Sequence, residues 1–145
     1  MFENFQGSLS LLQNIFIVRS FNHLLDPAGF IKWSHHQLSP KGKLVVMVID
    51  FVEACRRRGV LKTQVDHPYM FTQKTLVNFV RNGGFEVEYN VTDGDYVYLV
   101  ACKDDRAPFS RLEIDSSAYG KIIKTLAPGK KQWRRRFNDF FGLKQ

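Results

Sequence analysis

Two short apolar runs stand out in the first third of the chain. Residues 14–19 and 44–49 are rich in β-branched and aromatic side chains and contain almost no polar alternation. Runs of this kind are typical of strands buried on both faces, as in a parallel sheet with helices above and below. Between them, an Asp-Pro pair at 26–27 suits a helix start, and the breaker cluster 39–42 suits its end. The pattern predicts a helix over residues 27–38 within a right-handed βαβ unit.

The later part of the pattern predicts one more helix and a hairpin. Thr72 suits the N-cap of a helix over residues 73–82, which ends at two glycines. Two strand-like runs, residues 85–92 and 96–103, flank an Asp-Gly pair of the kind found in hairpin turns. The stretch between Phe51 and Thr72 shows no such pattern, so we expect a linker there. Together these elements predict an α/β fold with a sheet of about four strands and flanking helices.

The composition excludes several classes of protein. The chain has 145 residues, of which 44% are hydrophobic and 24% are charged, as in a single globular domain. Its longest apolar run is far too short to cross a membrane, and its first residues lack the features of a signal peptide. Cys55 and Cys102 lie far apart in sequence, and the adjacent His35 and His36 would point in different directions on a helix. We therefore expect no metal site and a cytoplasmic protein with reduced thiols.

The excess of basic residues lies at the end of the chain. Eight basic side chains and one acidic side chain follow residue 120, so residues 121–145 carry the whole net charge of +7. Four aromatic residues there are spaced so that they share one face of a helix: Trp133, Phe137, Phe140 and Phe141. A basic amphipathic helix suits weak, salt-sensitive binding to an anionic membrane surface or an acidic partner. Alternatively, the aromatic side chains pack on the body of the protein and the basic face stays in water.

Four segments carry a resemblance to a known family. They are the run from Phe21 to Pro27, the lead-in 38–43 to the second strand, residues 66–72, and the helix end 83–87. In this order and spacing they resemble class I S-adenosylmethionine-dependent methyltransferases, in particular the small-molecule branch. In that branch a turn similar to Leu-x-Pro-Gly-Gly precedes the fifth strand, and a Gly-Phe pair precedes the sixth. The resemblance implies a Rossmann-like sheet whose last strand is antiparallel and is inserted beside strand 44–50.

The resemblance covers only the second half of that fold. The first half in the family carries a Gly-rich turn for the cofactor, and this chain has no G-x-G-x-x-G-like run. We expect residues 1–105 to form the C-terminal half of a methyltransferase-like domain, and residues 106–145 to form a linker and a basic helical tail. The chain would then be a truncated form or one part of a split enzyme. Strand 14–19 would be an exposed edge that pairs with the missing half or with a second copy of the chain.

Candidate cofactor contacts follow the first strand. In the family, the segment after this strand lines the methyl-donor site, which by resemblance assigns binding of S-adenosylmethionine to Phe21, Asn22 and His23. His23 is also a candidate general base for an acceptor that must lose a proton. The alternative is that Asn22 and His23 only cap the ends of the strand and the helix.

Candidate substrate contacts lie after the second strand and before the second predicted helix. Asp50 and Phe51 come at the carboxyl end of strand 44–50, where open α/β sheets bind their ligands. By resemblance, the segment that contains His67 and Tyr69 closes over the acceptor, with His67 as a second catalytic candidate. The structural alternatives are a solvated strand end for Asp50, a loop anchored by the aromatic side chains of Tyr69 and Phe71, and a hydrogen bond to the backbone for His67.

Two functions are compatible with these residues. The first is transfer of a methyl group from S-adenosylmethionine to a small-molecule acceptor, which requires the other half of the domain for activity. Three consecutive arginines at residues 56–58 suit a phosphate-bearing acceptor or, alternatively, a solvated surface. The second function is a non-catalytic interaction module that uses its basic tail to bind an anionic membrane or a partner.

Overall fold

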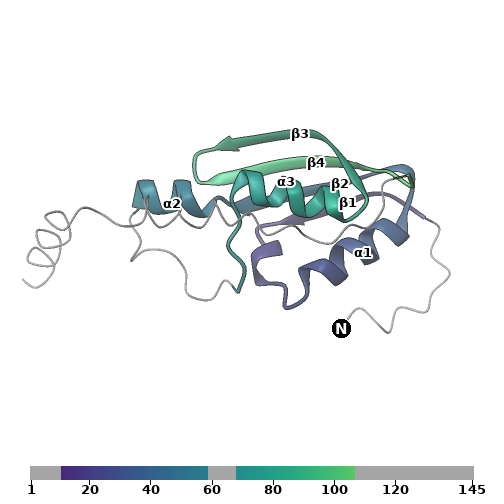
Figure 1. Ribbon diagram of the computed structural model, residues 1–145, viewed down its shortest axis with the longest axis horizontal. Coiled ribbons are helices and arrows are strands. Elements are labelled where there is room, and N and C mark those ends of the chain that lie inside the picture. Colours follow the sequence, from purple (N-terminus) through teal and green to yellow (C-terminus); the bar gives the residue numbers. More distant parts are fainter. Residues whose placement is uncertain (1–10, 59–67, 107–145) are drawn as a thin grey trace, which may run out of the picture.

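A mixed four-stranded sheet forms the centre of the protein. The structure is a computed structural model, and it describes residues 11–58 and 68–106. Figure 1 shows the helices and strands in chain order: β1 (Leu12–Val18), the 3₁₀ turn η1 (Phe21–His23), α1 (Pro27–Gln37), β2 (Leu38–Ile49), α2 (Phe51–Arg58), α3 (Gln73–Asn82), β3 (Phe85–Asp93) and β4 (Tyr96–Lys103).

The strand order is β1-β2-β4-β3. β1 runs parallel to β2, because α1 carries the chain back across the sheet between them. β4 is antiparallel to both β2 and β3 and lies between them. The turn at Gly94, which has φ +61°, joins β3 to β4 and requires the backbone freedom of glycine. The fold class and the inserted antiparallel strand are confirmed as predicted.

The second strand begins earlier than predicted. β2 begins at Leu38, directly after α1, and continues through the residues predicted to break the pattern. The pairing with β1 passes from Leu12–Leu38 to Asn14–Lys43, so one residue of β1 faces four residues of β2. These four residues form a bulge in which Lys41 has φ +64°. The Pro and Gly residues therefore bend the strand, whereas the prediction placed them in a loop.

The predicted linker after Phe51 is wrong for residues 51–58, which form helix α2. This helix has only eight residues, four of them charged, so its periodic signal is short. Among residues 51–57, Ala54 and Cys55 are buried. It is held by a cap at its start and by pairing of Glu53 with Arg56 along its surface. In Figure 1, α2 projects beyond the end of the sheet.

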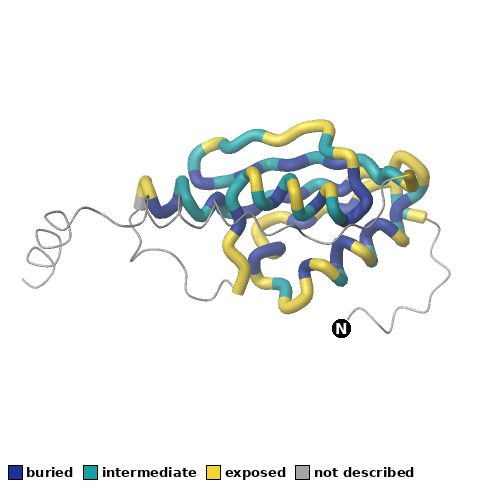
Figure 2. Tube along the Cα trace, viewed as in Figure 1, coloured by how far each residue is buried: buried dark blue, intermediate teal, exposed yellow. Residues whose placement is uncertain are grey.

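One face of the sheet is the core. α1 and α3 pack on this face, and the burial is visible along both helices in Figure 2. Strands β1, β2 and β4 contribute alternate residues to this core: Ile15, Ile17, Leu44, Val46, Val48, Val97, Leu99 and Ala101. Phe21, Ile31, Leu76 and Val80 fill the space between helices and sheet, each with 2% exposure or less.

The opposite face of the sheet, called the outer face below, is not covered by any helix of the described residues. Phe16 and Val18 of β1 are 68% and 53% exposed. The expectation that strand 14–19 is buried on both faces is therefore wrong for the outer face. Within residues 11–58 and 68–106, β1 pairs with β2 alone and is an edge strand, as predicted. No described helix is long and apolar enough to span a bilayer.

Candidate functional site

Three segments meet at the carboxyl ends of β1 and β2. They are the turn η1, the start of α2, and the segment before α3. Asp50 forms a parallel bridge with Phe71, and the backbone N–H of Phe51 donates to the carbonyl oxygen of Phe71 over 2.8 Å. Asn22 reaches the same segment from η1. The structure thus brings together five of the predicted site residues: Phe21, Asn22, Asp50, Phe51 and Tyr69. His23, the sixth described candidate, is exposed at the end of η1.

Asp50 holds the starts of two helices. Its side chain is buried, with 5% of the residue exposed. One carboxylate oxygen accepts from the N–H groups of Val52 and Glu53 over 3.0 and 3.1 Å, and the other accepts from Gln73 over 3.0 Å. Negative charge at a helix N-terminus is favourable, because the N–H groups there lack partners within the helix. Both oxygens of Asp50 are therefore engaged in fixing α2 and α3, and its role toward a substrate stays a prediction.

Asn22 and Tyr69 tie two loops together. Asn22 is 3% exposed, and its amide group donates to the carbonyl oxygen of Tyr69 over 3.2 Å. The Tyr69 hydroxyl donates in the other direction, to the carbonyl oxygen of Leu25 over 3.2 Å. The Tyr69 ring is 38% exposed and stacks on Phe71. These bonds fix the segment before α3 against the turn after β1.

Phe21 lies beneath this surface. It is fully buried, and its ring centroid lies 5.3 Å from that of Phe71 and 6.0 Å from those of Phe30 and Phe79. A ring in this position supports the loops from below, since aromatic pairs at this separation stabilise one another. Phe71, for which the sequence predicts only a loop anchor, joins β2, η1 and α3. His67, a predicted catalytic residue, lies outside the described residues.

A cavity of about 530 Å³ opens beside Asp50, between the starts of α2 and α3 and the β3–β4 hairpin. Arg56, Arg57 and Lys74 line it. The Arg56 guanidinium pairs with Glu53 over 2.6 Å, and Nε of Arg57 lies 3.8 Å from the carboxylate of Asp95. Two of the three arginines that suit a phosphate-bearing acceptor thus face a cavity, and both have carboxylate neighbours. The sequence pattern does not indicate this cavity, because it does not predict α2.

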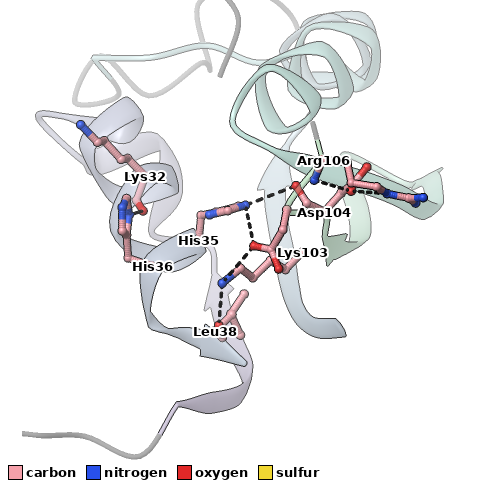
Figure 3. A network of polar contacts seen from close by, with 8 residues as sticks. Lys32, His35, His36, Leu38, Lys103, Asp104 and Arg106 are labelled. Atoms are coloured by element: carbon pink, nitrogen blue, oxygen red, sulfur yellow. Dashed lines mark hydrogen bonds and ion pairs between the residues drawn. The ribbon is translucent and has the colours of Figure 1, made fainter. Parts of the chain in front are cut away.

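The two adjacent histidines diverge, as expected. In Figure 3, His35 points toward the end of β4, where its Nε2 lies 3.5 Å from the carbonyl oxygen of Asp104, and its ring packs on Phe85. His36 turns back along α1, with Nδ1 2.7 Å from the carbonyl oxygen of Lys32. Among the described residues, no three His, Cys, Asp or Glu side chains gather where they would hold a metal ion.

The described residues do not fit S-adenosylmethionine as a complete site. Phe21 is fully buried and presents no surface to a ligand. The amide nitrogen of Asn22 already donates to Tyr69. His23, Phe51 and Tyr69 retain exposed surface, but they form only one border of a site for a molecule of this size. These residues alone therefore do not support a methyl-transfer step.

The chain is similar to solved methyltransferase structures. A SAM-dependent methyltransferase from Thermotoga maritima matches with a TM-score of 0.52 and 19% identity, over 66% of this chain and 59% of that chain. An O-methyltransferase family protein from Burkholderia thailandensis matches with a TM-score of 0.54 and 15% identity, over 72% of this chain and 33% of that chain. A chain from the complex between the Haloferax volcanii Trm112 methyltransferase activator and a candidate methyltransferase matches with a TM-score of 0.54 and 11% identity, over 71% of this chain and 57% of that chain.

These similarities establish the fold. The chain has an α/β fold that resembles the Rossmann-like fold of methyltransferases. No protein-family model matches the chain, and no curated protein matches its sequence. The chain spans between 33% and 59% of the length of the three structures described above.

Proposed function

We propose that this protein supplies the acceptor-side half of an S-adenosylmethionine-dependent methyltransferase that acts on a small molecule. The observation that carries the proposal is the position of antiparallel β4 between β2 and β3, in a fold similar to solved methyltransferases. The family resemblance of the sequence implies the same strand arrangement.

In this proposal, the residues at the carboxyl ends of β1 and β2 border the reaction site. S-adenosylmethionine, when bound, supplies the activated methyl group. His23 and Tyr69 contact the cofactor or the acceptor from the border of the site, and Phe51 packs against the acceptor. Methyl transfer is a displacement at carbon, so the main requirement is correct positioning of the two reactants. The tie from Asn22 to Tyr69 and the double cap by Asp50 provide a rigid border for that purpose.

The other half of the site comes from a complementary segment that pairs with β1. Among residues 11–58 and 68–106, β1 pairs with β2 alone, so its other edge offers backbone N–H and C=O groups to a further strand. A complementary strand added to this edge would continue the sheet. It would also bring residues to the side of η1 that the described chain leaves open.

Calorimetric titration of the full chain with S-adenosylmethionine tests the proposal. A site with only one border leaves most of the ligand in water, so we expect no saturable binding below about 1 mM. Binding in the micromolar range would show that the chain holds a complete cofactor site and would overturn the assignment to one half. The competing interaction-module function rests on residues 121–145, which lie outside the described residues, and stays a prediction.

A further inference from the structure

The outer face of the sheet carries a continuous apolar surface. The strand register places its residues in two neighbouring rows across β1, β2 and β4: Phe16, Val45 and Val100 in one, and Val18, Met47 and Tyr98 in the other. Side chains at paired positions lie on the same side of a sheet, so all six point away from α1 and α3. Figure 2 shows exposed and partly buried residues along these strands.

This surface has the character of a docking site. Phe16 and Val18 are more than half exposed, and the other four residues are partly buried. Contiguous apolar patches of this kind on water-soluble domains mark contacts with other elements or chains. The described part of the chain contributes no helix to this side of the sheet.

The surface has an acidic border. β3, at the far edge of the sheet, carries Glu86, Glu88 and Asp93 and no basic residue. Glu88 pairs with Lys43 over 2.8 Å, and Lys41 of β2 also lies close enough to act on Cys102, so the three carboxylates and two lysines leave a net charge of −1. At the other end of the face, Arg19 lies over the ring of Tyr96. An occupant of the outer face is therefore expected to combine apolar side chains with basic groups.

The end of the same chain has this combination. Residues 121–145 carry a charge of +7 together with the four aromatic residues that share one predicted helix face. Trp133 follows Arg106 by 27 residues, a stretch that spans up to about 90 Å when extended. The four strands are only about 15 Å across, so the segment can reach any part of the face.

We propose that residues 130–141 cover the outer face, with their aromatic side chains against the two apolar rows and their basic side chains toward the acidic border of β3. The chain leaves the sheet from β4, which lies in the middle of the sheet, so the segment starts close to its docking surface. A second copy of the chain is a poorer occupant, because its own β3 would add three more carboxylates to the contact.

Cys102 provides a native probe of this contact. It lies on the outer face, paired with Lys43 of β2 and Glu86 of β3, and is partly buried. Cys55 lies on α2, far from the outer face in the strand register, and is buried, so it reports on unfolding. The rate at which iodoacetamide labels each thiol in the full chain can be measured by peptide mass spectrometry.

The test compares the unsubstituted chain with the double variant Phe137→Ser/Phe140→Ser. Loss of two aromatic contacts should open the face and raise the labelling rate of Cys102 about tenfold, with no change at Cys55. Added salt should also raise the rate in the unsubstituted chain, because it screens the basic segment from the acidic border. The control Gln132→Ser/Asn138→Ser changes the same segment away from the aromatic face and should leave both rates unchanged.

Equal Cys102 rates in the unsubstituted chain and the double variant would overturn the proposal. A rate that falls as the protein concentration rises would also overturn it, because a second copy would then be the occupant. If Cys55 labelling rises in the double variant, that variant has unfolded, and a photocrosslinking amino acid at position 140 decides the question. The proposal requires crosslinks to residues 44–49 or 96–102 within one molecule. Crosslinks between two molecules, or none to these strands, would reject it.

Discussion

Asp50 shows how one side chain fixes the geometry of the candidate site. Its carboxylate accepts three backbone N–H groups and joins the end of β2 to the starts of α2 and α3. A buried carboxylate with all its contacts supplied by N–H groups is stabilising, because those groups would otherwise lack partners. Loss of this side chain therefore affects two helices at once.

We predict that Asp50→Ala lowers the free energy of unfolding by about 2–4 kcal/mol, as measured by urea denaturation. Asp26 is a matched control, because it caps α1 alone through one bond of 2.8 Å to the N–H of Gly29 and is exposed. Asp26→Ala should cost only about 1 kcal/mol. A loss at Asp50 no larger than that at Asp26 would contradict the double-cap role.

Cys102 permits a prediction on pH dependence. Burial raises the pKa of its thiol, and the negative charge of Glu88 raises that pKa further, while Lys43 lowers it. Since the thiolate is the reactive form, alkylation of Cys102 should begin at a higher pH than that of an exposed cysteine. Removal of the Glu88 charge favours the thiolate, so Glu88→Gln should move the midpoint of the alkylation rate to lower pH.

Glu86→Gln is the control for this prediction. Glu86 also raises the pKa of Cys102, but it is a weaker cause than Glu88. Its substitution should produce the smaller shift in the midpoint, measured by alkylation across pH 7–11. The same midpoint in both variants and in the unsubstituted chain would show that Glu88 does not face the thiol. A change in accessibility would scale the rate at every pH and would leave the midpoint in place.

The sequence located most of the candidate site residues but not what they do in the fold. Asp50 follows a buried strand, and the sequence pattern around it is the same for a carboxylate that binds a ligand and for one that caps two helices. Asn22 was placed correctly after β1, yet its bond to Tyr69 joins residues that are 47 positions apart. Contacts over such separations depend on the tertiary structure, so a local pattern cannot assign them.

At the scale of elements, α1 and α3 meet at a point where space is tight. A Cβ atom added at Gly83, just after α3, would collide with Cγ2 of Ile31, which lies on α1 and is 2% exposed. The φ of Gly83 is −89°, so the requirement for glycine here is steric. The close approach of α1 and the end of α3 therefore requires a residue without a side chain at position 83.

We predict that Gly83→Ala destabilises the fold by about 2–3 kcal/mol in urea denaturation, because neither helix can move away without opening the core. Gly94→Ala should cost only about 1–2 kcal/mol, since Gly94 has φ +61° but nothing within 4 Å of an added Cβ. The double variant Gly83→Ala/Ile31→Ala should lose less free energy of unfolding than the two single variants lose together, because the shorter side chain leaves room for the added Cβ. Strict additivity would mean that the two residues do not meet.

The elements themselves were predicted where local signals and packing agree. Both ends of α3 follow from Thr72 and the glycines after Asn82, and the hairpin follows from its turn residues. α2 was missed because half of its eight residues are charged and because its start depends on a cap that also serves α3. The start of β2 was missed because a bulge accommodates Pro40 and Gly42 within the strand, which a breaker pattern does not reveal.

At the scale of the whole molecule, the described helices cover one face of the sheet and contribute nothing to the other. α1 and α3 complete a core with strands whose outer residues are also apolar, and β1 is a free edge within the described chain. Strands with two apolar faces are expected where both sides are covered. In the two proposals above, a complementary methyltransferase half occupies the open edge, and the end of this chain covers the outer face.

The measurement that tests the central claim most directly is an NMR titration of the isotopically labelled full chain with S-adenosylmethionine, followed through backbone amide shifts. If the chain is the acceptor-side half, the shifts should be confined to residues 21–24, 51 and 69–71 and should not saturate below about 1 mM. Saturation at micromolar concentrations would contradict the claim that half of the site is absent. Larger shifts elsewhere, or none at these residues, would contradict the claim that they border the cofactor.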